Sequence, residues 1–250
     1  MYQFFVDDAQ IGKEFITITG SDVNHIRNVL RMKPGEKIRV SNQKGQDYLC
    51  SISELSDDFV QADILDSEAA NTELSAKIYL FQALPKGDRM ETVIQKAVEL
   101  GVHEIIPVSM KYCVVKLDAK KAENKRKRWQ AIAESAAKQS KRSLIPVVRE
   151  VMNFDEAVAY AKSFKVNLVP YENERGMAVT RKVIEALKPD DTISVMIGPE
   201  GGFSAEEIEK VKQENMKIIS LGKRILRTDT AAISTLSMLM LHLEMSEQVP

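Results

Sequence analysis

MIGPEGGFSAEEI, at residues 196–208, and LGKRILRTDTAA, at residues 221–232, are the two stretches that decide the fold of this chain. The first predicts a buried strand over 193–197, a glycine-rich loop over 198–202 and a helix capped by Ser204, which has capping-box spacing to Glu207. The second predicts a short strand over 217–221, a break at Gly222, and an apolar helix from Thr228 to about Met245. Two loops are therefore expected side by side, each at the carboxyl end of a strand.

The glycine-rich loop has two interpretations. Without Cβ atoms at positions 198, 201 and 202, a ligand could approach backbone N–H groups beside a helix N-terminus. A GPEGG run alone is more often a tight turn, and the chain contains neither of the common phosphate-binding glycine patterns. The second loop favours binding because Ile225 and Leu226, among basic residues, need something to bury them.

Composition is that of an ordinary globular protein. With 250 residues, 44% of them hydrophobic, the chain can form one large domain or two smaller ones. Neither a leader peptide nor an apolar run of about 18 residues is present, which predicts a cytoplasmic protein without a membrane partner. Two isolated cysteines, Cys50 and Cys113, and three scattered histidines argue against a metal site and against disulfides.

The net charge of −1 hides an uneven distribution. Residues 1–75 carry 7 Lys and Arg against 13 Asp and Glu, residues 76–150 carry 16 against 8, and residues 151–250 carry 12 against 15. Much of the basic charge falls on a helix predicted over 119–140. A solvated helix face and a patch that contacts RNA phosphates are equally good interpretations. The RNA-binding candidates here are Lys125, Arg126, Arg128 and Arg142.

The pattern of predicted elements changes near residue 72. Before it, strands are expected over 3–6, 15–19, 37–41, 48–53 and 59–64, with a helix over 21–31, and they indicate a small β-barrel. Residues 66–75 suggest a linker. After it, strands over 78–83, 104–108 and 166–169 alternate with helices over 88–100, 119–140 and 177–187. This α/β alternation predicts a mainly parallel sheet with helices on both faces, in a domain spanning 73–250.

The pair GPEGGFS and LGKRILRTDTAA resembles the C-terminal motifs of the SPOUT methyltransferases, specifically the RsmE-type enzymes that methylate N3 of a uridine in 16S ribosomal RNA. The resemblance extends through residues 88–108, 127–148 and, more weakly, 25–40. The family target is uridine 1498. One departure is Asp229, where the family usually has Glu. The resemblance implies a trefoil knot in 73–250, an exception to the rule against knots, and a PUA-like RNA-binding barrel in 1–72.

The resemblance also implies the cofactor S-adenosylmethionine, bent in the knot between three loops. An apolar slot with backbone hydrogen bonds, which the second loop can offer, would suit its adenine. The expected cofactor-binding residues are Leu168, Pro170, Glu172, Ile197, Gly198, Glu200, Gly201, Gly202, Leu221, Gly222, Ile225, Leu226, Thr228 and Ala231.

Methylation of uridine N3 requires loss of its proton, alignment of the nitrogen with the S–CH₃ bond, and removal of the base from pairing. The catalytic candidates are Arg227, expected to hold the target nucleotide, and Glu200. Glu200 either takes part in proton removal or only fixes its loop through hydrogen bonds. Lys223, Arg224 and Arg31 are further RNA-binding candidates, although the position of Arg31 at the end of the first helix favours a solvated helix end over an RNA contact.

The apolar residues of the last helix cover nearly its whole circumference, which predicts either a homodimer interface or a fully internal helix. The expected partners are 16S ribosomal RNA in the small ribosomal subunit and a second copy of the chain, without DNA. Two other functions stay open: a SPOUT enzyme that acts on transfer RNA, and a ribosomal-RNA-binding module without catalysis.

Overall fold

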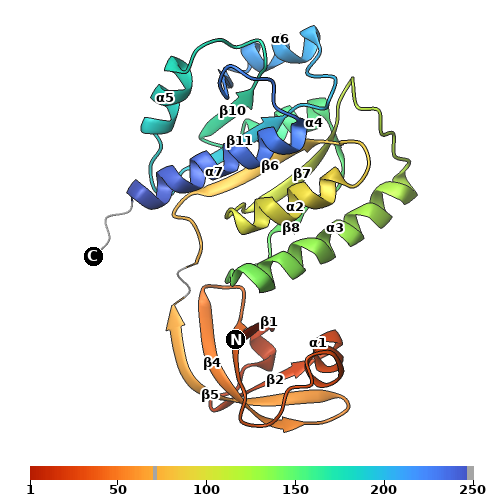
Figure 1. Ribbon diagram of the computed structural model, residues 1–250, viewed down its shortest axis with the longest axis vertical. Helices are drawn as coiled ribbons and strands as arrows, with labels where there is room; N and C mark the ends of the chain where they lie inside the picture. The colour runs from red at the N-terminus through yellow and green to blue at the C-terminus, as the bar shows by residue number, and fades with distance from the viewer. Residues whose placement is uncertain (70–71, 247–250) are drawn as a thin grey trace. The chain divides into compact units, whose positions relative to one another are not determined.

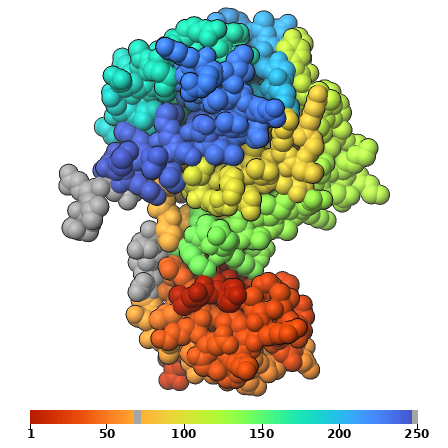
Figure 2. Space-filling view, in the orientation of Figure 1, coloured from red at the N-terminus to blue at the C-terminus, as the bar shows by residue number. Residues whose placement is uncertain are grey.

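The computed structural model describes residues 1–69 and 72–246 and divides the chain into two compact units (Figure 1). The first unit comprises Met1–Glu73 and Ala137–Ile145. The second comprises Leu74–Ala136 and the chain from Pro146 onward. A segment remote in sequence therefore completes the N-terminal unit. Figure 2 shows the surface of the same chain, with the described residues in colour.

The first unit is a curled five-stranded sheet with strand order β1-β3-β4-β5-β2. Strands β1 and β3 pair in parallel and the other pairs are antiparallel. Two register shifts between β4 and β5 increase the local twist that curls the sheet around its core. The strands are β1 (Tyr2–Phe5), β2 (Phe15–Thr19), β3 (Lys37–Ser41), β4 (Gln46–Leu55) and β5 (Phe59–Ala69).

Two sequence predictions for this unit were wrong in detail. Residues 66–69 are not linker, because β5 continues to Ala69 in register with the start of β4. The helix predicted over 21–31 is a short α1 (Ser21–Asn24) followed by a π-helix (His25–Val29). This wider turn keeps Ile26 and Met32 in the core, and Arg31 lies beyond it with φ at 53°.

The second unit contains an all-parallel sheet with strand order β12-β10-β11-β6-β7-β8, and β9 also pairs with β7. Strands β7 and β11 are buried almost without interruption, as expected for strands covered on both faces. The predicted α/β class is therefore confirmed. The strands are β6 (Lys77–Ala83), β7 (Glu104–Ser109), β8 (Val147–Val148), β9 (Met152–Asn153), β10 (Val166–Pro170), β11 (Thr192–Ile197) and β12 (Lys217–Ile219).

Helices cover this sheet, and α2 and α7 lie side by side along it (Figure 1). Helix α4 was not predicted, although Asn153 and Glu156 form the capping box that marks its start. None of the described helices is long and apolar enough to cross a membrane. The helices are α2 (Arg89–Glu99), α3 (Ala119–Ser140), α4 (Phe154–Ala161), α5 (Ala178–Glu185), α6 (Ala205–Gln213) and α7 (Thr228–Ser246).

Candidate functional site

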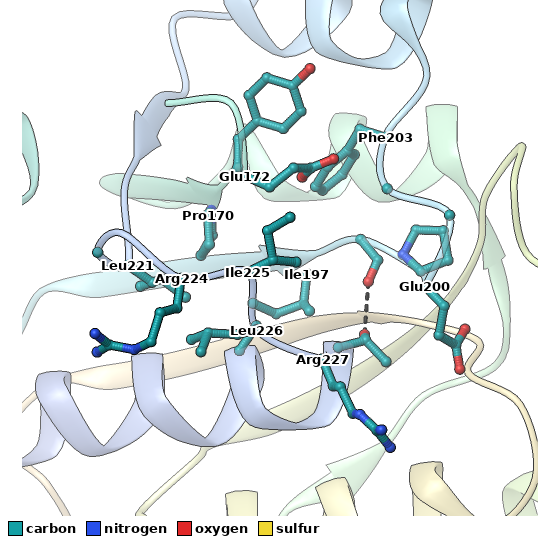
Figure 3. A pocket seen from close by; sticks show the side chains of 18 of the residues that line it. Pro170, Glu172, Ile197, Glu200, Phe203, Leu221, Arg224, Ile225, Leu226 and Arg227 are labelled. Atoms are coloured by element: carbon teal, nitrogen blue, oxygen red, sulfur yellow. Dashed lines mark hydrogen bonds between the residues drawn. The ribbon is translucent and has the colours of Figure 1, made fainter. Parts of the chain in front are cut away.

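The carboxyl ends of β10, β11 and β12 lead into three loops that enclose a cavity of about 420 Å³ (Figure 3). This volume lies within the usual range for small-molecule sites. Every predicted cofactor-binding residue except Leu168 lines the cavity. Leu168 does not reach it because its side chain is fully buried within β10, between β11 and β12. Arg175 and Phe203 also line the cavity; Phe203 belongs to the first motif but was not predicted to bind the cofactor, and no sequence pattern marked Arg175.

The glycines at 198 and 201 were expected to leave room for a ligand, but they make room for neighbouring side chains of the protein. A Cβ on Gly201 would lie 2.9 Å from the Cβ of Tyr112, so this glycine makes room for the protein rather than for a ligand. A Cβ on Gly198 would similarly lie 2.8 Å from the Phe203 ring. Gly222 differs because its Cβ would meet no protein atom within 4 Å, and its φ of 107° favours glycine. Gly222 is therefore the glycine whose missing side chain leaves the cavity open.

Buried hydroxyl groups fix both C-terminal loops. Thr228 Oγ1, at the start of α7, donates to the Gly198 carbonyl at 2.7 Å, which ties the two loops together (Figure 3). Thr180 Oγ1, from α5, donates to the Ser220 carbonyl at 2.8 Å. Ser220 Oγ in turn accepts from the Gly222 N–H at 3.2 Å. The cavity walls are thus held in place by side chains that face away from the solvent.

The loop over 223–227 offers unused binding groups. Within the described part of the chain, its backbone N–H groups donate to no backbone carbonyl. Ile225 in this loop is 85% exposed although its side chain is fully apolar. Free backbone donors beside apolar side chains are the features by which proteins hold an aromatic heterocycle. The residues therefore fit a ligand with an adenine-like base.

The carboxylate of Glu200 accepts hydrogen bonds from residues that do not line the cavity. Its Oε1 accepts from the Lys86 N–H at 3.0 Å and from Arg89 Nη1 at 2.6 Å. Figure 3 shows its carboxylate directed away from the centre of the cavity. Burial by itself would raise the pKa of Glu200, but these donors lower the pKa below its ordinary value of 4.5. A carboxylate of this kind is a weak base, so the geometry supports the loop-fixing interpretation of Glu200.

Glu200→Gln is expected to change kcat by less than about threefold, because the amide oxygen can still accept both hydrogen bonds, whereas losing a general base costs about a hundredfold or more. The pKa of Glu200 is lower in the folded protein than in the unfolded chain, so its ionised form stabilises the loop at any pH above the unfolded-state pKa. That stabilisation is lost only as the pH falls through the folded-state pKa. The pH profile of kcat should therefore match wild type from about pH 6 to about pH 9. If the fall in kcat at low pH were present in the wild type and absent in the variant, Glu200 would be identified as the general base.

Four cations without an ion-pair partner border the cavity. Arg175, Lys223, Arg224 and Arg227 are exposed, and in residues 1–69 and 72–246 none of them has an ion-pair partner. On α3, by contrast, Arg126 pairs with Glu123 at 2.8 Å, and Arg128 pairs with Glu91 at 2.9 Å. Lys125 lies over the Trp129 ring at 5.8 Å. The cations at the cavity are thus free to meet a polyanion, whereas two of the arginines on the predicted basic helix are already paired with glutamates.

The two RNA-binding candidates of the first unit differ. Arg142 is only 3% exposed, and its guanidinium pairs with Glu73 in the same unit. A buried, paired guanidinium cannot reach a phosphate, so Arg142 is withdrawn from the RNA-binding set. Arg31 is exposed beyond the end of the π-helix and therefore remains a candidate for RNA binding.

Residues 72–240 match the model of the RNA methyltransferase domain, and residues 18–65 match that of the RNA methyltransferase PUA domain. The chain belongs to the RNA methyltransferase family. Its relatives include the ribosomal RNA small subunit methyltransferase E of Bacillus subtilis, 38% identical over 88% of each chain. The protein of that name from Mesomycoplasma hyopneumoniae is 37% identical over 95% of this chain and 98% of its own.

Solved structures of RNA methyltransferase family relatives have the same fold. The ribosomal RNA small subunit methyltransferase E of Neisseria gonorrhoeae, bound to S-adenosylmethionine, is 30% identical with a TM-score of 0.84, over 96% of this chain and 97% of its own. A putative methyltransferase of Legionella pneumophila, also in complex with S-adenosylmethionine, is 33% identical with a TM-score of 0.85 over the same shares. The expected family and its SPOUT fold class are confirmed.

Proposed function

We propose that this protein transfers a methyl group from S-adenosylmethionine to N3 of a uridine in 16S ribosomal RNA, with uridine 1498 as the target. Methylation of small-subunit ribosomal RNA with S-adenosylmethionine follows from the family and from its cofactor-bound relatives. The choice of uridine and of its N3 atom is the finer part of the proposal. The observation that carries the proposal is the cavity that the two motif loops form together with the loop after β10.

The lining residues suit the parts of this cofactor. Leu221, Ile225 and Leu226 provide the apolar slot for adenine, and the free backbone N–H groups beside them provide its hydrogen bonds. The exposed carboxylate of Glu172 faces the cavity and offsets positive charge on a ligand there (Figure 3). When bound, S-adenosylmethionine supplies an activated methyl group on a positively charged sulfur.

The remaining groups position the RNA. Arg227 lies immediately before α7, lines the cavity and has no carboxylate partner in the described chain, so its guanidinium is free to hold the target nucleotide. Lys223 and Arg224 are placed to contact phosphates. Because Glu200 is committed to Arg89, catalysis by this site depends mainly on aligning the uridine nitrogen with the methyl group.

Removing the cavity cations should weaken RNA binding more than removing those on α3. For the pair Lys223→Ala and Arg224→Ala, we expect a loss of about 1 kcal/mol per phosphate contact and a smaller salt slope. The matched pair Arg126→Ala and Arg128→Ala should have a smaller effect, because both arginines already pair with glutamates. RNA affinity measured over a range of salt concentrations checks this. A larger change in the salt dependence of RNA affinity for the α3 pair would indicate that α3, and not the cavity, contacts the RNA phosphates.

We infer that the protein acts as a homodimer. Helix α7 buries one stripe of side chains within the protomer, including Leu236, Leu239 and Leu243. The opposite side leaves Leu241 50% and Met245 77% exposed. An apolar surface of this kind is typical of an interface between subunits. The fully internal helix, which was the alternative, does not agree with these exposures.

The architecture expected from the family completes the proposal. We assign RNA recognition to the PUA-like unit in addition to the cavity, with Arg31 as a candidate contact. The knot is inferred from the family fold, and the placement of β11 between β10 and β6 is compatible with it. The substrate would be the small ribosomal subunit in the cytoplasm, without a DNA or membrane partner.

Nucleoside mass analysis of RNA from cells with and without the gene tests this function. We expect 3-methyluridine to disappear from small-subunit ribosomal RNA and to return when the gene is restored. Loss of a methylated nucleoside from transfer RNA instead would favour the transfer RNA alternative. Unchanged RNA of both kinds would favour the module without catalysis.

A further inference from the structure

A buried glutamine lies behind the cavity without contributing to its lining. Gln82, on β6, is 0% exposed, and its strand neighbour in register is Ile197, the last residue of β11 before the glycine-rich loop. Buried polar side chains in a sheet core oppose folding unless hydrogen bonds satisfy them. Gln82 Oε1 has no partner among the described residues, so this side chain is not there for stability alone.

The contacts of Gln82 determine which way its amide faces. One terminal atom of the side chain lies 3.0 Å from the Ala83 carbonyl oxygen and 2.9 Å from Thr228 Oγ1. A carbonyl oxygen can only accept, so this atom must be the amide nitrogen. Gln82 therefore donates to the hydroxyl oxygen of Thr228.

This donation fixes the direction of the next hydrogen bond. Thr228 Oγ1 lies 2.7 Å from the Gly198 carbonyl, which also can only accept. With its oxygen facing the Gln82 amide, the hydroxyl has its proton free for Gly198. The result is a one-way relay, Gln82 to Thr228 to Gly198, which joins β6, α7 and the first residue of the glycine-rich loop.

We propose that Gln82 is a positioning residue for the cofactor loop, acting through the hydroxyl of Thr228 on the carbonyl of Gly198. The relay turns this carbonyl toward α7 and holds the loop in the shape that lines the cavity. Thr228 is 5% exposed, so water does not compete for these bonds. The inference rests on the proposed function, because it assigns the relay to S-adenosylmethionine binding.

The test compares calorimetric affinities for S-adenosylmethionine in wild type, Gln82→Met, Thr228→Val and the double variant. Methionine and valine retain the shapes of the residues they replace but not their hydrogen bonds. We expect Gln82→Met to weaken binding about tenfold, and the double variant to bind no more weakly than Thr228→Val, because both changes interrupt one relay. Thr228→Ser, which retains the hydroxyl, should restore affinity to near wild type.

Steady-state kinetics and thermal unfolding separate positioning from a loss of structure. Gln82→Met should raise KM for S-adenosylmethionine while KM for RNA stays constant, and its Tm should not fall, because the unpartnered oxygen is removed. If Gln82→Met folds poorly, Gln82→Leu replaces it in the same comparison. Wild-type affinity in a folded Gln82 variant, or additive effects in the double variant, would overturn the inference. A wild-type chain that does not bind S-adenosylmethionine would overturn the proposed function as well.

Discussion

Gly222→Val is expected to abolish binding of S-adenosylmethionine, by about a hundredfold or more, while the chain still folds. The valine side chain would extend into the space that Gly222 leaves open, at a position that lines the cavity. Calorimetry measures the affinity, and circular dichroism reports the fold.

Backbone strain needs its own control, because φ at Gly222 is 107° and valine adopts this conformation poorly. Gly35→Val provides the control. Gly35 has φ at 90° and equally open surroundings, but it lies in the other unit and does not line the cavity. Both variants should lose stability, and only Gly222→Val should lose the cofactor. Wild-type affinity for S-adenosylmethionine in a folded Gly222→Val variant would show that this cavity is not the cofactor site.

Leu241→Glu is expected to convert the proposed homodimer into folded monomers with little methylation activity. Leu241 is 50% exposed in the protomer, so a charge there costs the monomer little but would be buried without a partner in the dimer. Sedimentation measures the assembly state, and circular dichroism measures helix content. Met238→Glu should act in the same direction, with more loss of stability because Met238 is partly buried.

Leu239→Glu is the matched control for this surface. Leu239 lies on the same helix but is 0% exposed, so a glutamate there should unfold the protomer rather than only dissociate it. An active, well-folded dimer of Leu241→Glu would show that α7 does not form the interface.

The sequence was most informative where local chemistry determines structure. Ser204 and Glu207 form the predicted capping box, and α3 has the predicted bounds of residues 119–140. The motif loops enclose one cavity because parallel strands end at the same edge of a sheet. Helix α2, predicted over 88–100, buries one face because its apolar residues Met90, Val93, Ile94, Ala97 and Val98 repeat with helical spacing.

Features set by partners far along the chain could not be predicted. Arg142 pairs with Glu73, which is 69 residues away, and Arg128 pairs with Glu91, 37 residues away. Gly201 is explained by Tyr112, from a loop after β7 that carried no motif. The pair of Arg126 with Glu123 is different, because its i,i+3 spacing was visible in the sequence.

The central claim is that this cavity holds S-adenosylmethionine for transfer to uridine N3. The most direct test incubates the purified protein with isotope-labelled S-adenosylmethionine and small ribosomal subunits from cells that lack the gene. Digestion of the RNA and nucleoside mass analysis then identify the labelled product. We predict labelled 3-methyluridine at a single position of 16S ribosomal RNA, and none with Gly222→Val. Label on another base or on ribose, or no label from a protein that binds the cofactor, would contradict the account.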